Sequence, residues 1–242
     1  MRSDREFEVV RELADQGLND CEIARRTGIP RSTIRGWRAG TQRTTRTRDY
    51  DWSRLDRAQY SYLFGLYLGD GHISRLANGV YRLRISLDER HIRIVMWCID
   101  AIHAVMPGNR VQCVQAPGCT VVGCYSRHWR ALMPQHAAGK KHDRPIVLEP
   151  WQQDIVDRHP REFLRGLVHS DGSRFMNRVR VNGKEYAYPR YNFTNHSADI
   201  RRLFTDTLDQ LGIAWRQMNR YNVSVARREA VAALDAFIGP KR

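Results

Sequence analysis

Apolar residues occur in short blocks along the chain, and the spacing within each block is either helical or alternating. Taken in order, the blocks between residues 59 and 145 predict the succession αββαββα, and those between residues 146 and 242 predict it again. Residues 80–87, which alternate apolar and polar and follow an Asn-Gly pair, are typical of a strand beside a hairpin turn. The pattern therefore predicts an α+β fold built from two similar repeats.

Each repeat opens on a similar segment, LFGLYLGDG at residues 63–71 and LRGLVHSDG at residues 164–172. In both, one small residue follows another at a spacing of four: Gly65 and Gly69 in the first segment, Gly166 and Ser170 in the second. Because positions i and i+4 share a helix face, we expect each helix to present a face that another helix can approach closely. The closing Asp-Gly predicts the end of the helix, with the glycine in the left-handed conformation.

The acidic residue of each segment, Asp70 or Asp171, falls at the carboxyl end of its helix, where the helix dipole disfavours negative charge. If the two helices pack together, the two carboxylates also lie close to one another and repel. A divalent cation with oxygen ligands removes both penalties. We therefore expect Asp70 and Asp171 to share a metal site.

The two segments resemble the LAGLIDADG (dodecapeptide) motif of homing endonucleases in the apolar helix, the small packing residues and the terminal Asp-Gly. The resemblance implies a single-chain protein whose two repeats are related by a pseudo-twofold axis, each contributing a curved antiparallel sheet to a saddle over DNA. It also implies Mg²⁺ as the cofactor, held by the aspartates and by backbone groups at the helix ends: Asp70, Asp171, Gly69 and Ser170. The motif often carries an acid two positions before the terminal one, where this chain has Leu68 and His169.

The resemblance further implies a basic residue near the scissile phosphate in each repeat. The run Gly-Lys-Lys-His offers Lys140 or Lys141 in the first repeat, and the chain end offers Lys241 in the second. A lysine in this place polarises the attacking water or stabilises the pentacovalent phosphate. Together with Asp70 and Asp171, these lysines are the expected catalytic residues.

Residues 1–40 predict a small all-α domain of three helices, with the run IARRTGIPRSTI across the second and third. This run resembles the helix-turn-helix of resolvases and transposases, in which a glycine makes the turn. The third helix would then present these residues to DNA: Arg31, Ser32, Thr33, Arg35 and Arg38. A small helical core with a solvated basic face is the alternative. Residues 41–58 lack apolar periodicity and predict a basic linker that either follows DNA or is a flexible tether.

Long polar side chains on the predicted strands are candidates for contacting bases, because side chains alternate between the two faces of a strand. The candidates are Arg82, Arg84, Arg178, Arg180, Arg190 and Asn192. A solvated face is common in antiparallel sheets, and each of these residues taken alone is equally compatible with that interpretation.

Composition narrows the class of partner. A formal charge of +14 favours a polyanion, so we expect double-stranded DNA rather than a membrane, for which no apolar run is long enough. Five cysteines, an odd number, are unlike a disulfide framework and indicate a reducing cytoplasm, with nucleoid association in a prokaryote. Cys113, Cys119 and Cys124 lack a Cys-x-x-Cys pair, so strand positions suit them better than a zinc site.

Two functions fit these features. The first is that of a site-specific double-stranded DNA endonuclease, in which Mg²⁺-dependent hydrolysis of phosphodiester bonds uses one aspartate from each repeat. The second is that of a sequence-specific transcriptional regulator whose LAGLIDADG domain binds DNA without cleaving it, although the presence of both aspartates weighs against it. A purely structural module fits the charge least well. Because one chain carries both repeats, we expect a monomer to suffice.

Overall fold

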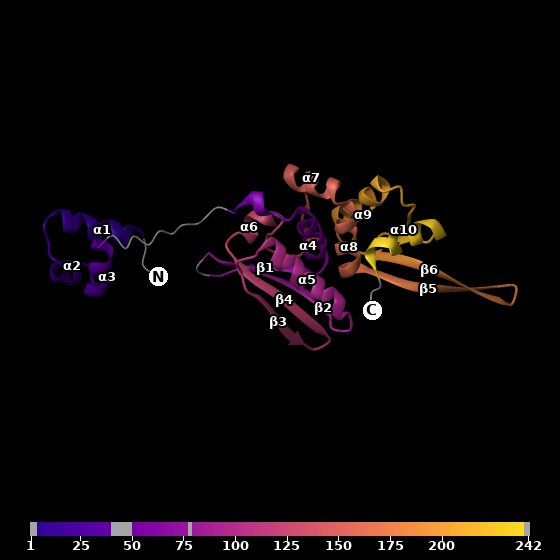
Figure 1. Ribbon diagram of the computed structural model, residues 1–242, viewed down its shortest axis with the longest axis horizontal. Helices are drawn as coiled ribbons and strands as arrows, with labels where there is room; N and C mark the ends of the chain where they lie inside the picture. The colour runs from indigo at the N-terminus through magenta and orange to yellow at the C-terminus, as the bar shows by residue number, and fades with distance from the viewer. Residues whose placement is uncertain (1–3, 40–49, 77–78, 240–242) are drawn as a thin grey trace. The chain divides into compact units, whose positions relative to one another are not determined.

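The computed structural model describes residues 4–39, 50–76 and 79–239, except for the side chains of Asp4 and Val181 (Figure 1). By the contacts among its residues, the chain divides into two compact units, 1–48 and 49–242. Within the described ranges, no helix is both long and apolar enough to cross a lipid bilayer.

The amino-terminal unit contains three helices: α1 (Asp4–Asp15), α2 (Asp20–Thr27) and α3 (Arg31–Arg38). They enclose a small core of their own: Val10, Ile23, Ile29 and Ile34. Gly28 has φ 68°, a left-handed conformation that glycine adopts without steric cost, so the chain turns sharply between α2 and α3. The predicted all-α helix-turn-helix unit is therefore confirmed.

The larger unit contains the predicted succession of elements twice. The first repeat follows a short 3₁₀ turn, η1 (Trp52–Arg54), and consists of α4 (Arg57–Asp70), β1 (Gly71–Arg75), β2 (Tyr81–Asp88), α5 (Ile92–Val105), β3 (Val111–Ala116), β4 (Cys119–Ser126) and α6 (Trp129–Leu132). The second consists of α8 (Pro160–Asp171), β5 (Gly172–Val181), β6 (Lys184–Thr194), α9 (Ala198–Gln210), β7 (Arg216–Asn219), β8 (Asn222–Val225) and α10 (Arg228–Ile238). Between the repeats lie a 3₁₀ turn, η2 (Lys141–Asp143), and a helix, α7 (Pro150–Arg158), which the sequence-based prediction did not include.

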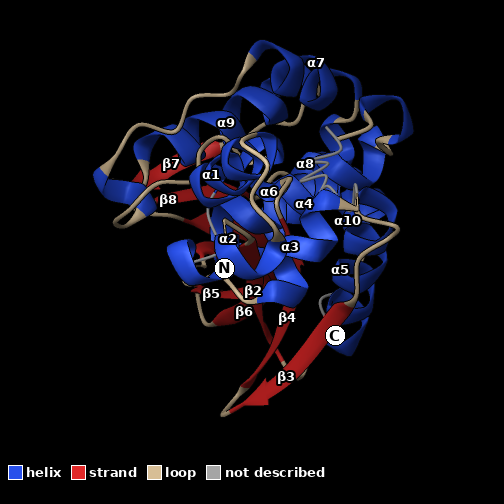
Figure 2. Cartoon of the chain, turned by 90° about the vertical axis from the view of Figure 1, so that its left-hand side faces the viewer, coloured by secondary structure: helices blue, strands red, loops and turns tan. Residues whose placement is uncertain are grey.

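The strands form two antiparallel sheets of the same topology, with the orders β1-β2-β4-β3 and β5-β6-β8-β7. Helices α4 and α8 lie side by side between the two sheets (Figure 1). Figure 2, coloured by secondary structure, shows the strands β2 and β4 running below these helices. The predicted α+β fold with two αββαββα repeats is confirmed.

Helix α4 occupies the centre of the larger unit. Every residue from Tyr60 to Leu68 is buried, because α8, α5, α7 and the strands β1 and β2 all pack against this helix. A helix that is apolar on all sides is typical of such a central position. Ser61, in this stretch, donates a hydrogen bond from its hydroxyl to the carbonyl oxygen of His159 at the start of α8 (2.9 Å).

Candidate functional site

The crossing of α4 and α8 depends on glycine at its closest point. A Cβ atom placed on Gly65 would lie 2.5 Å from the carbonyl oxygen of Phe163 and 3.0 Å from the Cα atom of Gly166. Contacts this short do not occur in proteins, so both positions must lack a side chain. The predicted close approach of the two helices is confirmed, and it fixes the place where their carboxyl ends meet.

The glycines that follow the two aspartates, Gly71 and Gly172, are extended, with φ −86° and −93°. The predicted left-handed ending is therefore wrong. A Cβ atom on Gly71 would lie 2.5 Å from the Cα atom of Tyr67, and one on Gly172 would lie 2.7 Å from the Cα atom of Val168. Glycine is needed here because the strand leaves the helix end directly against the preceding helical turn.

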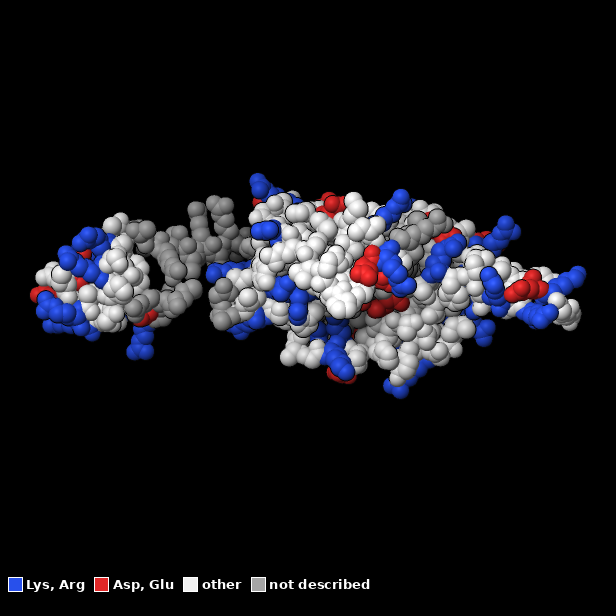
Figure 3. Space-filling model, turned by 90° about the horizontal axis from the view of Figure 1, so that it is seen from below, with Lys and Arg blue, Asp and Glu red and all other residues white. Residues whose placement is uncertain are grey.

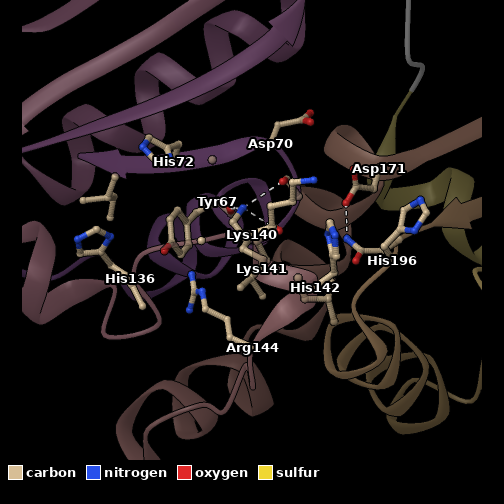
Figure 4. Close-up of a pocket in the computed structure, with 18 of the residues that line it drawn as sticks. Tyr67, Asp70, His72, His136, Lys140, Lys141, His142, Arg144, Asp171 and His196 are labelled. Carbon is tan, nitrogen blue, oxygen red and sulfur yellow. Dashed lines mark hydrogen bonds between the residues drawn. The ribbon is translucent and has the colours of Figure 1, made fainter. Parts of the chain in front are cut away.

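Asp70 and Asp171, at the carboxyl ends of α4 and α8, both line one cleft of about 630 Å³ (Figure 4). A Cβ atom on Gly69 would lie 3.0 Å from Asp171 Oδ2, so the carboxylate of the second repeat lies against the helix end of the first. Asn195 Nδ2 donates a hydrogen bond of 2.6 Å to the same Oδ2 atom and orients it. The two helix ends therefore bring one carboxylate from each repeat to a shared cleft.

Lys141, in the turn η2, reaches the carboxyl end of α4 in this cleft. Its Nζ donates hydrogen bonds to the carbonyl oxygens of Leu68 and Gly69, each 3.0 Å long, and of Tyr67. Burial lowers the pKa of Lys141 to about 8, although Asp171 and Asp70 act in the opposite direction. The ammonium group therefore neutralises part of the negative potential of the helix end and of both carboxylates.

A chain of buried amides holds the segment that carries Lys141. Tyr60 Oη on α4 accepts a hydrogen bond from Gln152 Nε2 of α7 (2.7 Å), and Gln152 Oε1 accepts one from Gln135 Nε2 (2.5 Å). The carbonyl oxygen of Gln135 in turn accepts a hydrogen bond from the guanidinium of Arg144, three residues after Lys141. Helix α7 thus ties the loop between the repeats to the central helix.

Basic and imidazole side chains line the same cleft, as Figure 4 shows: His72, His136, Lys140, Lys141, His142, Arg144 and His196. Burial, followed by the charges of Arg84 and Lys141, lowers the pKa of His72 and so favours its neutral form. The rings of His142 and His196 lie 5.6 Å apart between centroids. A cleft with this lining suits a phosphate group next to the two carboxylates.

A second, smaller cleft of about 360 Å³ lies at the end of α8. It is lined by Asp70, Ser170, Ser173 and Arg174, together with Asp88, the last residue of β2. The register places Gly71 opposite Ile85 and Gly172 opposite Phe193, so Leu87, which also lines this cleft, holds the position that Asn195 holds in the second repeat. The first repeat therefore has an apolar side chain at the position of the amide that orients Asp171 in the second repeat.

The donor set of the first cleft fits a hard cation only in part. In the portion of the chain that the structure describes, no group of three or more His, Cys, Asp or Glu side chains is arranged to hold a metal ion. Asp70 and Asp171 are oxygen donors of the kind that Mg²⁺ uses with one or two carboxylates, while water or substrate phosphate completes its shell. The Gly69 carbonyl already accepts a hydrogen bond from Lys141, and Ser170 Oγ donates to the Gly166 and Leu167 carbonyls (3.1 and 3.0 Å).

Of the two predicted lysines of the first repeat, Lys141 reaches the helix end with its ammonium group, whereas Lys140 is exposed at the rim of the cleft. Lys241 lies outside the described residues. Sequence reasoning missed Asn195, His136, His142 and His196, since nothing in their local sequence marks them.

The sequence profile of a homeodomain-like domain matches residues 1–45. Among solved structures, a mesophilic variant of the homing endonuclease I-DmoI is similar to this chain, with a TM-score of 0.50 and 14% sequence identity over 75% of this chain and 96% of that chain. The chain has the LAGLIDADG fold. The N-terminal LAGLIDADG domain of DUF199/WhiA is also similar, with a TM-score of 0.47 and 15% sequence identity over 77% of this chain and 84% of that chain. The LAGLIDADG meganuclease I-AabMI bound to uncleaved DNA has a TM-score of 0.48 and 11% sequence identity over 74% of this chain and 82% of that chain. No curated protein has a sequence that matches this chain.

In the first LAGLIDADG repeat, Arg82 and Arg84 project from β2 on the face away from the core. Arg82 pairs with Tyr125 of β4, and Arg84 pairs with Gly123 of the same strand. The guanidinium of Arg82 therefore lies 5.2 Å from the centroid of the Tyr125 ring. The Nε atoms of both arginines are buried and have no hydrogen-bond partner.

In Figure 3, basic side chains lie along the two-repeat unit on both sides of a central acidic group.

In the second LAGLIDADG repeat, the predicted strand residues do not share one face. Arg190 and Asn192 lie on the face opposite to the buried Tyr191, whereas the register places Arg178 and Arg180 on the same face as Tyr191. The Asn192 amide donates to Thr194 Oγ1 (3.0 Å) and to Asn222 Oδ1 (3.1 Å). The four residues therefore cannot all face one ligand from the same side of the sheet.

In the amino-terminal unit, the polar residues of α3 remain candidates for contacting DNA. Arg31, Ser32 and Arg35 are exposed and Thr33 is half-buried. Arg38 Nη1 forms an ion pair of 2.6 Å with Asp20 Oδ1. Arg38 therefore has a partner within its own unit that competes with a phosphate.

Proposed function

We propose that this chain is a site-specific double-stranded DNA endonuclease, with both repeats of the larger unit binding one target and one aspartate from each repeat taking part in cleavage. The observation that carries the proposal is the shared cleft between the ends of α4 and α8, which we call the LAGLIDADG helices. In this cleft the carboxylate of Asp171, at the end of α8, lies against Gly69 of α4. Two carboxylates at helix ends are electrostatically costly, and a cleft that keeps them suggests a functional reason.

The proposed cofactor is Mg²⁺, held by Asp70 and Asp171. When bound, such a cation would neutralise charge on the scissile phosphate and make water a stronger nucleophile. Asn195 would keep Asp171 in the orientation that faces the cleft, because its amide donates to Oδ2. The carboxylates would thus serve as ligands, which requires them to stay ionised.

Lys141 is the proposed catalytic lysine of the first repeat. With a pKa of about 8, most of its side chain is protonated at neutral pH, so it supplies positive charge beside the phosphate. Positive charge there stabilises the extra negative charge that develops on phosphate oxygens during in-line displacement. Lys140 and Lys241 stay proposals for the same role at the rim of the cleft and in the second repeat.

The proposal that the chain binds double-stranded DNA rests on its net charge and on the arginines of the first sheet. The net charge of +14 and the arginines on the outer face of the first sheet suit a polyanion. Residues 1–40 would add helix-turn-helix contacts, with residues 41–58 as the linker and 59–145 and 146–242 as the two repeats. A monomer would suffice, since both repeats belong to one chain.

The second candidate function is that of a sequence-specific DNA-binding regulator that does not cleave. One observation favours it: the ammonium group of Lys141 already binds the helix-end carbonyls and interacts with both carboxylates. A fixed lysine would in that case replace the cation and make the site structural.

Selection from a random duplex pool separates the two functions. The full chain is incubated with the pool in Mg²⁺ or in EDTA, and bound and cleaved molecules are sequenced separately. The endonuclease proposal expects one cleaved consensus in Mg²⁺ and none in EDTA, while the regulator expects a bound consensus without cleavage in either. An Asp70→Asn, Asp171→Asn double variant that cleaves as fast as the wild type would overturn the assignment of the aspartates.

A further inference from the structure

Strands β5 and β6 extend well beyond the sheet to which they belong. They pair along their whole length, from Gly172 opposite Phe193 to Val181 opposite Lys184, but β8 pairs with β6 only over residues 191–194. Figure 1 shows the outer part as a two-stranded ribbon that projects past α10. The outer ribbon therefore has two faces and no further strand beside it.

One face of this ribbon is rich in exposed apolar and aromatic side chains. The register pairs Phe175 with Arg190, Asn177 with Tyr188 and Val179 with Tyr186, and we call these six residues the ribbon face. Phe175 is 42% exposed and Tyr188 is 51% exposed. Arg174, on the opposite side of the strand, pairs with Asp235 of α10 (2.7 Å), so the ribbon face points away from that helix.

The stability of the fold does not explain why these apolar and aromatic side chains are exposed. A two-stranded ribbon in water gains little from apolar residues that remain exposed, and clustered apolar surface on a soluble protein marks a binding site. Arg190 belongs to the ribbon face, whereas Arg178 and Arg180 extend from the opposite face and Lys184 lies at the tip, so the surroundings of the ribbon face are basic. Apolar surface within a basic rim is complementary to the groove of a duplex, where phosphates flank apolar and hydrogen-bonding base edges.

The chemistry of the ribbon face fits one kind of base pair. The major groove admits a two-stranded ribbon, and there an apolar side chain contacts the thymine methyl group while asparagine pairs with adenine. The ribbon face offers Phe175, Tyr188 and Val179 for the thymine methyl groups and Asn177 for adenine, with a single arginine, Arg190, at its inner end. The first sheet instead offers Arg82 and Arg84, whose guanidinium groups suit guanine.

We infer that the ribbon face binds the major groove of an A·T-rich half-site through thymine methyl groups, while the other half-site contains guanines under the first sheet. This inference rests on the DNA binding of the proposed function and adds to it the base composition of each half-site. Each buried methyl group contributes about a fourfold gain in affinity, so two or three contacts amount to at least tenfold.

Thymine-to-uracil replacement tests the inference, because uracil lacks only the methyl group. The duplex bound most tightly in the pool selection is synthesised with uracil in one half-site, in the other, or in neither, and its affinity for the full chain is measured. We expect at least a tenfold loss for one half-site only. A Phe175→Ser, Tyr188→Ser variant, which keeps only Val179 of the proposed methyl contacts, should lose most of the preference for the thymine duplex.

Met176→Ser is the matched control, since Met176 is 49% exposed and belongs to the opposite side of the same strand. This variant should keep the full preference for thymine. Equal affinity of the wild type for thymine and uracil duplexes in both half-sites would overturn the inference while leaving the endonuclease proposal intact. Self-association that is lost in the Phe175→Ser, Tyr188→Ser variant, without any change in thymine preference, would also overturn it. Failure of the wild type to bind any duplex would overturn both.

Discussion

Substitution of Gly65 by alanine tests whether the crossing of the LAGLIDADG helices sets the geometry of the cleft. The added Cβ atom would lie 2.5 Å from the carbonyl oxygen of Phe163 and 2.8 Å from the backbone nitrogen of Leu167. Both are backbone atoms, so no side chain can rotate away. Reaching about 3.4 Å, the short end of ordinary van der Waals contact, requires the helices to separate by roughly 0.9 Å.

Overpacking of this kind costs about 1–3 kcal/mol, and a loss of about 2 kcal/mol lowers the melting temperature of a unit this size by roughly 4–8 °C. The larger effect concerns activity. Because Asp70 and Asp171 end the two helices that move apart, we expect cleavage to fall on the order of a hundredfold, the usual cost of a 1 Å displacement at a reacting centre.

Thermal unfolding and single-turnover cleavage of the selected duplex, measured on the same preparations, check both effects. Gly108→Ala is the control, since a Cβ atom at Gly108 meets no heavy atom within 4 Å and its φ is not left-handed. A Gly65→Ala protein that melts and cleaves like the wild type would refute the reasoning.

Three further predictions concern charge and buried polar groups. The pKa of Lys141 is lowered to about 8, so its ammonium form is lost as pH rises through that value. The single-turnover cleavage rate of the wild type should therefore fall above pH 8, whereas the rate of Lys141→Arg, which stays charged, should not. Gln152→Leu leaves Tyr60 without its donor and should cost about 1–3 kcal/mol in urea unfolding; a wild-type midpoint would contradict this. Arg174 lowers the pKa of Asp235, so their stabilisation is present above pH 3.8 and is lost as pH falls through the lower folded-state pKa. Acid unfolding of Asp235→Asn should lack that loss, and its stability at pH 7 should fall by less than about 1 kcal/mol.

The fold could be predicted from the sequence because the residues that allow its central helix crossing stand in short local motifs. Gly65 and Gly166 mark the helix crossing through spacing alone, and the repeated order of apolar blocks predicts the two sheets. The conformation of Gly71 could not be predicted, since the close approach of Tyr67 depends on where the strand leaves the helix. Helix α7 escaped prediction because its role, tying Gln152 to Tyr60, becomes visible only when two distant segments meet.

Some residues of the candidate site could likewise be predicted from the sequence, and others could not. Asp70 and Asp171 stand in a recognisable segment, whereas Asn195 reaches Asp171 only because β6 returns antiparallel to β5. The sequence could not separate Lys140 from Lys141, because the choice depends on how the turn η2 meets the end of α4. Arg178 and Arg190 look alike in sequence, and only the strand register places them on opposite faces.

The central claim is that the two LAGLIDADG helices bring one functional carboxylate each to a single cleft. Strand-resolved cleavage of the selected duplex by Asp70→Asn and Asp171→Asn, with DNA binding measured in parallel, tests it most directly. We expect each variant to bind the duplex within a few-fold of the wild type and to lose cleavage of one or both strands by more than about a hundredfold, consistent with the loss of a metal ligand. Wild-type cleavage of both strands by either variant would contradict the account.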